Sequence, residues 1–172
     1  MQFSVARPDV VRAINQRWLL KFWNQHLGTH RVPRWQPVEV ENLSRVAANL
    51  SILEVSAGTG PARFLVRFHG ESIGQIYGST DCRGKYLDEI IPSASHQEGL
   101  APYRQALDTG RPVYYERLLL PYSLDGQTID HIMASFEFVC PDGAFKLHAL
   151  MKSPDAAPVL RLSATIEPLA LA

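Results

Sequence analysis

The segment from Arg63 to Ile91 constrains the fold of this chain more than any other part of it. It opens with a strand over residues 62–69, in which apolar side chains recur at every second position. The strand breaks at Gly70. Residues 71–91 hold too many glycines for one long helix, because each interior glycine costs about 1 kcal/mol relative to alanine. A strand that runs into two or three short helical turns is typical of a cup-shaped binding module.

The composition is that of an ordinary globular protein, and it narrows the classes of partner. The 172 residues favour one domain with an appended helix, 46% of them are apolar, and 17 basic residues balance 17 acidic ones. A neutral chain has little attraction for phosphate, so nucleic acid is not expected as a partner. No apolar run approaches the roughly 20 residues of a membrane span, so a membrane is not expected either.

The start of the chain and its cysteines indicate the compartment. Residues 1–11 lack the basic start and the long apolar run of a secretion signal. Cys82 and Cys140 do not form a disulfide framework. These features predict a cytoplasmic, reducing location in which both thiols are structural.

A first helix is predicted over residues 8–27, with Gly28 where it would stop. Apolar residues occupy more of its circumference than one stripe, so the helix needs cover on more than one side. The cover is either the chain's own domain or a second copy of the same helix. The candidate dimer contacts are four residues at helical spacing, namely Val11, Ile14, Trp18 and Phe22.

Periodicity and turn residues predict the remaining elements. In chain order these are a short helix over 38–48, strands over 50–56 and 62–69, short turns over 71–91, a helix over 93–108, and strands over 113–122, 128–139, 144–151 and 159–166. The last of these strands alternates weakly and is expected at an edge of the sheet. Hairpins at both ends of this series predict an antiparallel sheet with helices on one face, which is an α+β domain.

The predicted organisation is an N-terminal helical extension (1–48), a sheet core (49–152) and a C-terminal tail or edge strand (153–172). A sheet that curls under short helices encloses a cavity, and such a cavity is a ready small-molecule site.

The order of these elements, with RFLVRFHGESIGQIYG, RGKYLDEI and LLLPYSLDG, resembles the PAS domain superfamily. The chain looks most like a branch of stand-alone bacterial PAS-like proteins. In that branch a tryptophan-bearing helix and a P-R-x-x-P segment precede the core, here Trp23 and residues 33–37. The resemblance covers about residues 18–139.

This resemblance implies a PAS-like five-stranded antiparallel sheet with helices on one face, used for sensing, signal transduction or protein contact. It also implies self-association through a helix that precedes the core. The chain departs from the family between Pro112 and Arg117, where the usual strand-turn-strand is shortened. The central hairpin is therefore either kept or fused into a single long strand.

Seven side chains are the candidate lining of the cavity, namely Phe64, Phe68, Tyr86, Tyr103, Tyr114, Met133 and Phe136. The alternative is that the same side chains only fill the core. A buried tyrosine hydroxyl needs a hydrogen-bond partner, which is either a polar ligand or a backbone carbonyl. The identity of a ligand does not follow from these residues.

Neither flavin nor haem is expected as a cofactor. Cys82 precedes Gly84, whereas the reactive cysteine of flavin-binding blue-light sensors follows the local glycine. A haem needs an axial imidazole that faces an apolar cavity, and only His96 lies on the longer predicted helix, near its exposed start. No histidine pair has zinc-like spacing beside cysteines, so no metal site is predicted.

A catalytic centre is not predicted, and the chain is not expected to be an enzyme. G-x-S-x-G is absent, and Asp130 and His131 are adjacent in a predicted strand, so they should face opposite ways. The sequence predicts a sensory or regulatory module that binds a small molecule or a protein partner and signals through self-association as a homodimer. The alternatives are a pure interaction or dimerisation module with a filled core, and an enzyme that has reused the cup.

Overall fold

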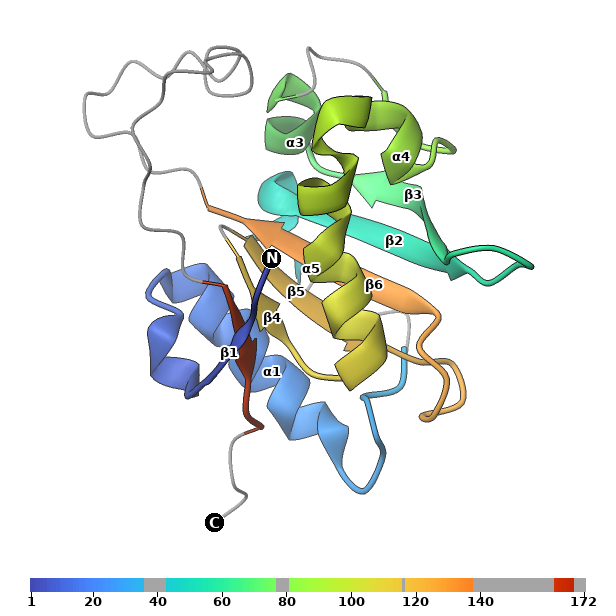
Figure 1. Ribbon diagram of the computed structural model, residues 1–172. Coiled ribbons are helices and arrows are strands. Elements are labelled where there is room, and N and C mark those ends of the chain that lie inside the picture. Colours follow the sequence, from blue (N-terminus) through green and yellow to red (C-terminus); the bar gives the residue numbers. More distant parts are fainter. Residues whose placement is uncertain (36–42, 77–80, 116, 138–162, 169–172) are drawn as a thin grey trace.

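The protein is an α+β domain whose described residues build a seven-stranded, mostly antiparallel sheet (Figure 1). The computed structural model describes residues 1–35, 43–76, 81–115, 117–137 and 163–168. In chain order the strands are β1 (Ser4–Ala6), β2 (Leu50–Ser56), β3 (Arg63–His69), β4 (Val113–Tyr114), β5 (Arg117–Tyr122), β6 (His131–Phe136) and β7 (Ala164–Ile166). The α-helices of the described residues are α1 (Ile14–Leu27), α3 (Glu71–Ile76), α4 (Leu87–Ile90) and α5 (His96–Thr109).

Two short strands, β1 and β7, extend the sheet beyond the five strands that the resemblance implies. The order across the sheet is β1-β7-β4-β5-β6-β2-β3. Strand β7, expected at an edge, therefore lies between β1, with which it pairs in parallel, and β4, with which it pairs antiparallel. The sequence does not predict β1, because three residues are too few to show the period of a strand. The strand predicted over 144–151 lies outside the described residues.

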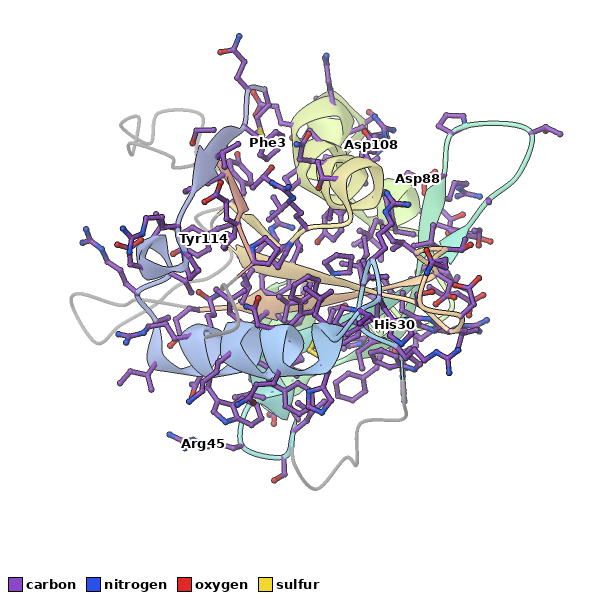
Figure 2. All side chains as sticks on the ribbon, turned by 90° about the horizontal axis from the view of Figure 1, so that it is seen from below. Phe3, His30, Arg45, Asp88, Asp108 and Tyr114 are labelled. Carbon is purple, nitrogen blue, oxygen red and sulfur yellow. The ribbon has the colours of Figure 1, made fainter. Side chains whose placement is uncertain are left out.

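Helices cover both faces of the sheet (Figure 1 and Figure 2). The sequence-based prediction of helices on one face is therefore wrong. Helices α3, α4 and α5 lie on one face, and α1 crosses the other. The central strands show why both faces need cover, since residues 118–122 of β5 and 132–135 of β6 are all buried. Trp23 Nε1 of α1 donates a hydrogen bond to the Pro121 carbonyl at 2.6 Å, and Gln16 Nε2 donates to the Ser135 carbonyl at 3.0 Å. The first helix is therefore part of the chain's own core.

Helix α1 begins at Ile14 and not at Pro8. Residues Pro8–Val10 form a separate 3₁₀ turn, and Ala13 has an extended backbone that interrupts the predicted helix. Gly28 ends α1 where the sequence predicts, with a φ of 52° that glycine adopts at little steric cost.

Strands β4 and β5 form an antiparallel hairpin, so the shortened segment after Pro112 is not a fused strand. The strands predicted over 50–56 and 62–69 are confirmed as β2 and β3. The helix predicted over 93–108 is confirmed as a 3₁₀ turn followed by α5, and Gly110 ends it in a left-handed conformation. Residues 38–42 of the helix predicted over 38–48 lie outside the described residues, and Ala47–Asn49 form a 3₁₀ turn.

Candidate functional site

A small hollow lies where the sequence predicts a cavity, between the sheet and the short helices. Its lining is Ser51, Val66, His69, Ile73, Cys82, Leu87, Ile90, Tyr103 and Phe136. The space inside that the centre of a water molecule can occupy is about 10 Å³, which is roughly the room for one water molecule. Small-molecule sites usually measure about 300–1,000 Å³. Among the described residues, this hollow is therefore almost completely filled by the chain's own side chains.

A β-bulge decides which side chains of β3 face the hollow. Ile52 pairs with Phe68 and Leu53 pairs with Val66, so Arg67 is an extra residue in β3. An extra residue shifts the alternation by one and sends the side chains that follow it to the opposite face. Phe68 is consequently 38% exposed instead of lining the hollow. The next residue along β3 takes the inward position.

That inward residue is His69, which ties residues 81–83 to the sheet. The backbone N–H of Cys82 donates to His69 Nε2 at 3.1 Å. A neutral ring must then carry its hydrogen on Nδ1, which lies 3.3 Å from the Gly70 carbonyl oxygen. Asp81 Oδ1 also approaches Nε2 at 3.1 Å. Arg83 forms a bidentate ion pair with Asp81 and holds the pKa of that carboxyl well below its usual range.

Strand register places two of the predicted lining residues on the face that α1 covers. Met133 lies three residues before Phe136, which lines the hollow, so the two side chains point to opposite faces. Tyr114 pairs with Leu118, which pairs with Ser135, so Tyr114 lies on the same face as Met133. Both faces of β6 are buried, and apolar character alone therefore does not select the face.

Of the seven predicted residues, Tyr103 and Phe136 line the hollow. Phe64 is buried against Tyr103, with their ring centroids 5.3 Å apart. Arg117 donates to the Tyr103 hydroxyl at 3.0 Å and lies 5.2 Å from the ring centroid of Phe136. Tyr86 lies outside the lining, under an arginine whose guanidinium carbon is 3.7 Å from its ring centroid.

The polar side chains of the lining already have partners. Ser51 Oγ donates to a backbone carbonyl of β3 at 3.1 Å, and the Tyr103 hydroxyl accepts from Arg117. Both ring nitrogens of His69 are engaged. Burial raises the pKa of the Cys82 thiol, which therefore stays protonated at neutral pH. The hollow thus offers a ligand neither space nor a polar group in need of a partner among the described residues.

Asp130 and His131 form a hydrogen-bonded pair on the other face of the sheet, so the prediction that they face opposite ways is wrong. His131 Nδ1 lies 2.6 Å from Asp130 Oδ1. Strand β6 begins at His131, so Asp130 lies before the strand and does not follow its alternation. The sequence leaves the direction of His131 open. In the structure Trp35 stacks on its imidazole, with centroids 4.9 Å apart and planes at 3°.

A carboxylate that holds an imidazole can orient a general base. Here the indole of Trp35 covers the ring, and within the described ranges no serine or cysteine is hydrogen-bonded to His131. The pair instead helps to fix the segment before residue 36. The backbone N–H of Trp35 donates to the Ser123 carbonyl at 2.6 Å, and the backbone N–H of Ser123 donates to the Pro33 carbonyl at 3.0 Å.

Tyr122 lies beneath the same segment, and its hydroxyl is buried without a hydrogen-bond partner among the described residues. Its ring meets Trp35 edge-on, with centroids 5.3 Å apart. Burial also raises the pKa of Tyr122. An unpaired buried hydroxyl costs free energy.

The candidate dimer residues divide between the core and the surface. Val11 is fully buried, so it does not belong to an accessible contact. Ile14 is 75% exposed and Trp18 is 42% exposed, and Phe22 is half-buried. The rings of Trp18 and Phe22 stack with centroids 5.8 Å apart. Helix α1 therefore carries an exposed apolar stripe in addition to the face that packs on the sheet.

No protein-family model matches this sequence, and a comparison with curated proteins finds no match. Of the helices in the described ranges, none combines the length and the apolar character needed to cross a bilayer. Nor do three or more His, Cys, Asp or Glu side chains of these ranges gather closely enough to hold a metal ion. The function of the chain is therefore inferred from its own geometry.

Proposed function

We propose that this chain is a PAS-like regulatory module that acts through protein contacts, in the cytoplasm, with its cup filled by its own side chains. The pairing of five adjacent strands supports the PAS-like part of the proposal, because β3, β2, β6, β5 and β4 are joined antiparallel throughout. Between β3 and β4 the chain forms α3, α4 and α5, which cover one face of these strands. This is the arrangement that the sequence resemblance implies.

The filled hollow is the observation that carries the choice of protein contact over ligand binding. A small molecule would have to displace Tyr103 or Phe136 from the lining. Arg117 contacts both rings, and Phe64 packs against the first of them. A ligand shifts a protein only toward a state that it binds better. A state open enough to admit one requires these contacts to break.

Native mass spectrometry of the purified chain, with an absorbance spectrum, tests this choice. We expect the mass of the 19.2 kDa chain without a small-molecule adduct, and absorbance from aromatic residues only. A stoichiometric adduct that is released on denaturation contradicts the filled cup and favours the small-molecule sensor that the sequence also predicts.

Self-association through α1 is the second candidate, and the exposed stripe is the observation that favours it. Replacing Trp18 and Phe22 together by glutamate should then lower the mass measured by light scattering and leave the far-ultraviolet circular dichroism unchanged. Phe68→Glu is the matched control, because Phe68 is exposed to a similar extent but lies on β3. If the wild-type chain is already monomeric, self-association through α1 is contradicted.

A further inference from the structure

The outer face of α1 is an apolar stripe that the core does not use. Ile14, Trp18 and Phe22 follow one another at intervals of four residues, which places them on one side of the helix. The inner side is already buried, with Leu19 and Trp23 at 0% exposure. Figure 2 shows α1 from the side, with side chains projecting from it away from the sheet. The stripe is therefore an accessible docking face. The helix that carries it is anchored to the sheet by its buried inner side.

Helix α1 itself carries basic residues beside this stripe and no acidic residue. These basic residues are Arg17 and Lys21. Residues 1–35 hold six of the 17 basic residues of the chain and only one of its 17 acidic residues, Asp9. The segment therefore has a formal charge of +5 within a neutral chain. Figure 2 shows Arg45 on the α1 side of the sheet, whereas Asp88 and Asp108 lie on the α5 side.

The basic residues of α1 also differ in their partners from three arginines elsewhere in the chain. Arg63, Arg67 and Arg83 each form an ion pair with a carboxylate of the chain itself. Arg17 and Lys21 are exposed, and in the ranges that the structure describes no carboxylate lies within ion-pair distance of either. Their charge is available to a molecule outside the chain.

The surrounding charge distinguishes among the occupants of the stripe. A second copy docked through a two-fold axis would bring the same basic residues together, and like charges oppose such a contact. A helix that lies in a membrane surface buries a broad apolar face, but most of the apolar surface of α1 is already buried against its own sheet. A partner helix needs only a few anchors at intervals of three and four residues, and acidic residues beside them would complement Arg17 and Lys21.

We propose that the outer face of α1 docks an acidic amphipathic helix of a partner protein. Its apolar side chains would contact Ile14, Trp18 and Phe22, and its glutamates or aspartates would lie opposite Arg17 and Lys21. This inference rests on the proposed function, because it names the partner class of a module that acts through protein contacts. A contact of a few helical turns belongs to the small end of protein interfaces, so the complex is transient.

Two labelled synthetic helices serve as the probes. One carries a leucine stripe flanked by glutamates, and the other has lysine at every glutamate position. Fluorescence anisotropy with the full chain should show at least about tenfold tighter binding of the acidic probe at low salt. The preference should shrink when NaCl rises from about 50 to about 300 mM, because salt screens exposed charges.

Variants of α1 separate the apolar and the charged parts of the contact. Trp18→Ala should weaken the acidic probe by about tenfold, as expected for an exposed aromatic anchor. Arg17→Glu with Lys21→Glu should reverse the preference toward the lysine probe. Phe68→Ala and Arg104→Glu are the matched controls, because these exposed residues lie on β3 and α5. Neither control should change binding of the acidic probe by more than about twofold.

Several outcomes overturn the proposal. Equal affinity for the two probes contradicts the role of charge. If Arg104→Glu weakens binding of the acidic probe as much as the α1 variants do, the contact is not on α1. Binding of the wild-type chain to phosphatidylglycerol vesicles with no binding of the acidic probe identifies a membrane surface instead. Self-association that Trp18→Ala abolishes identifies a second copy. A small-molecule adduct in the native mass spectrum would refute the filled cup and leave these results on α1 unaffected, so the two proposals fail separately.

Discussion

Among the glycines that the structure describes, Gly70 is the one at which an added methyl group should disturb the fold most. It lies between β3 and α3, and its N–H donates to the Leu50 carbonyl at 2.8 Å. A Cβ at this position would lie 2.1 Å from the carbonyl oxygen of Ala47 and 2.3 Å from that of Ala48. Replacing Gly70 by alanine therefore forces two segments of backbone apart.

The geometry sets the size of the effect. Ordinary contacts of a Cβ begin at 3.4 Å, so one backbone must move by more than 1 Å. The contacted atoms belong to a 3₁₀ turn that continues into β2, and no change of rotamer relieves the clash. Overpacking costs about 1–3 kcal/mol, and we expect the upper end, about 3 kcal/mol, because both partners are backbone. For a domain of this size the loss corresponds to a fall in Tm of roughly 6–12 °C.

Gly58→Ala is the matched control, because no atom lies within 4 Å of its Cβ and its φ is not positive. That variant should be unchanged or up to about 1 kcal/mol more stable. Urea denaturation followed by far-ultraviolet circular dichroism measures the free energy of unfolding of both variants. If the two variants differ by less than about 0.5 kcal/mol, the close approach of Gly70 to residues 47–48 is refuted.

Buried and turn side chains give the remaining predictions. In a Cys140→Ser background, iodoacetamide should alkylate Cys82 slowly at neutral pH and faster as the pH rises above the ordinary thiol value of 9.0, because burial raises the pKa of Cys82; rapid labelling at neutral pH contradicts this burial. Asp125→Ala should lower Tm at neutral pH, because the Asp125 carboxylate accepts hydrogen bonds from Ser123 Oγ and from two backbone N–H groups, which lower its pKa. A lowered folded-state pKa stabilises the fold above the unfolded value, so the deficit in Tm should shrink as the pH falls below about 4, and a deficit that persists in acid argues against this role. Tyr122→Phe should leave the free energy of unfolding unchanged or raise it by about 1–3 kcal/mol, since it removes an unpaired buried hydroxyl; a loss of stability in urea would reveal a partner.

Elements with a repeating local pattern are those that the sequence predicts well. Strands β2 and β3 and helix α5 are long enough to show a period, and Gly28 and Gly110 end helices where the chain needs a positive φ. Strand β1 holds three residues and leaves no such pattern, and the segment that contains β7 alternates only weakly. Their place in the sheet depends on pairing between the two ends of the chain, which no local window contains.

The candidate site is predicted less well, because it depends on the face of the sheet to which each side chain points. Knowing which residues form strands and helices does not settle that. Phe68 is outside the hollow because of a bulge against β2, and Met133 is outside it because it points to the opposite face of β6, which is buried as well. Neither feature is visible in the composition of one strand. Asp130 and His131 meet because β6 begins at His131, three residues later than predicted, so that Asp130 lies outside the strand.

The order of the chain's residues was sufficient to predict a mixed fold with an antiparallel sheet, broken helical turns after Gly70 and an apolar first helix. Packing in three dimensions settled that α1 lies on its own sheet, that His69 takes the inward place of Phe68, and that the hollow among the described residues is almost filled. The reason is that alternation along a strand separates two faces but does not say which layer meets each. That assignment depends on register with residues distant in the chain.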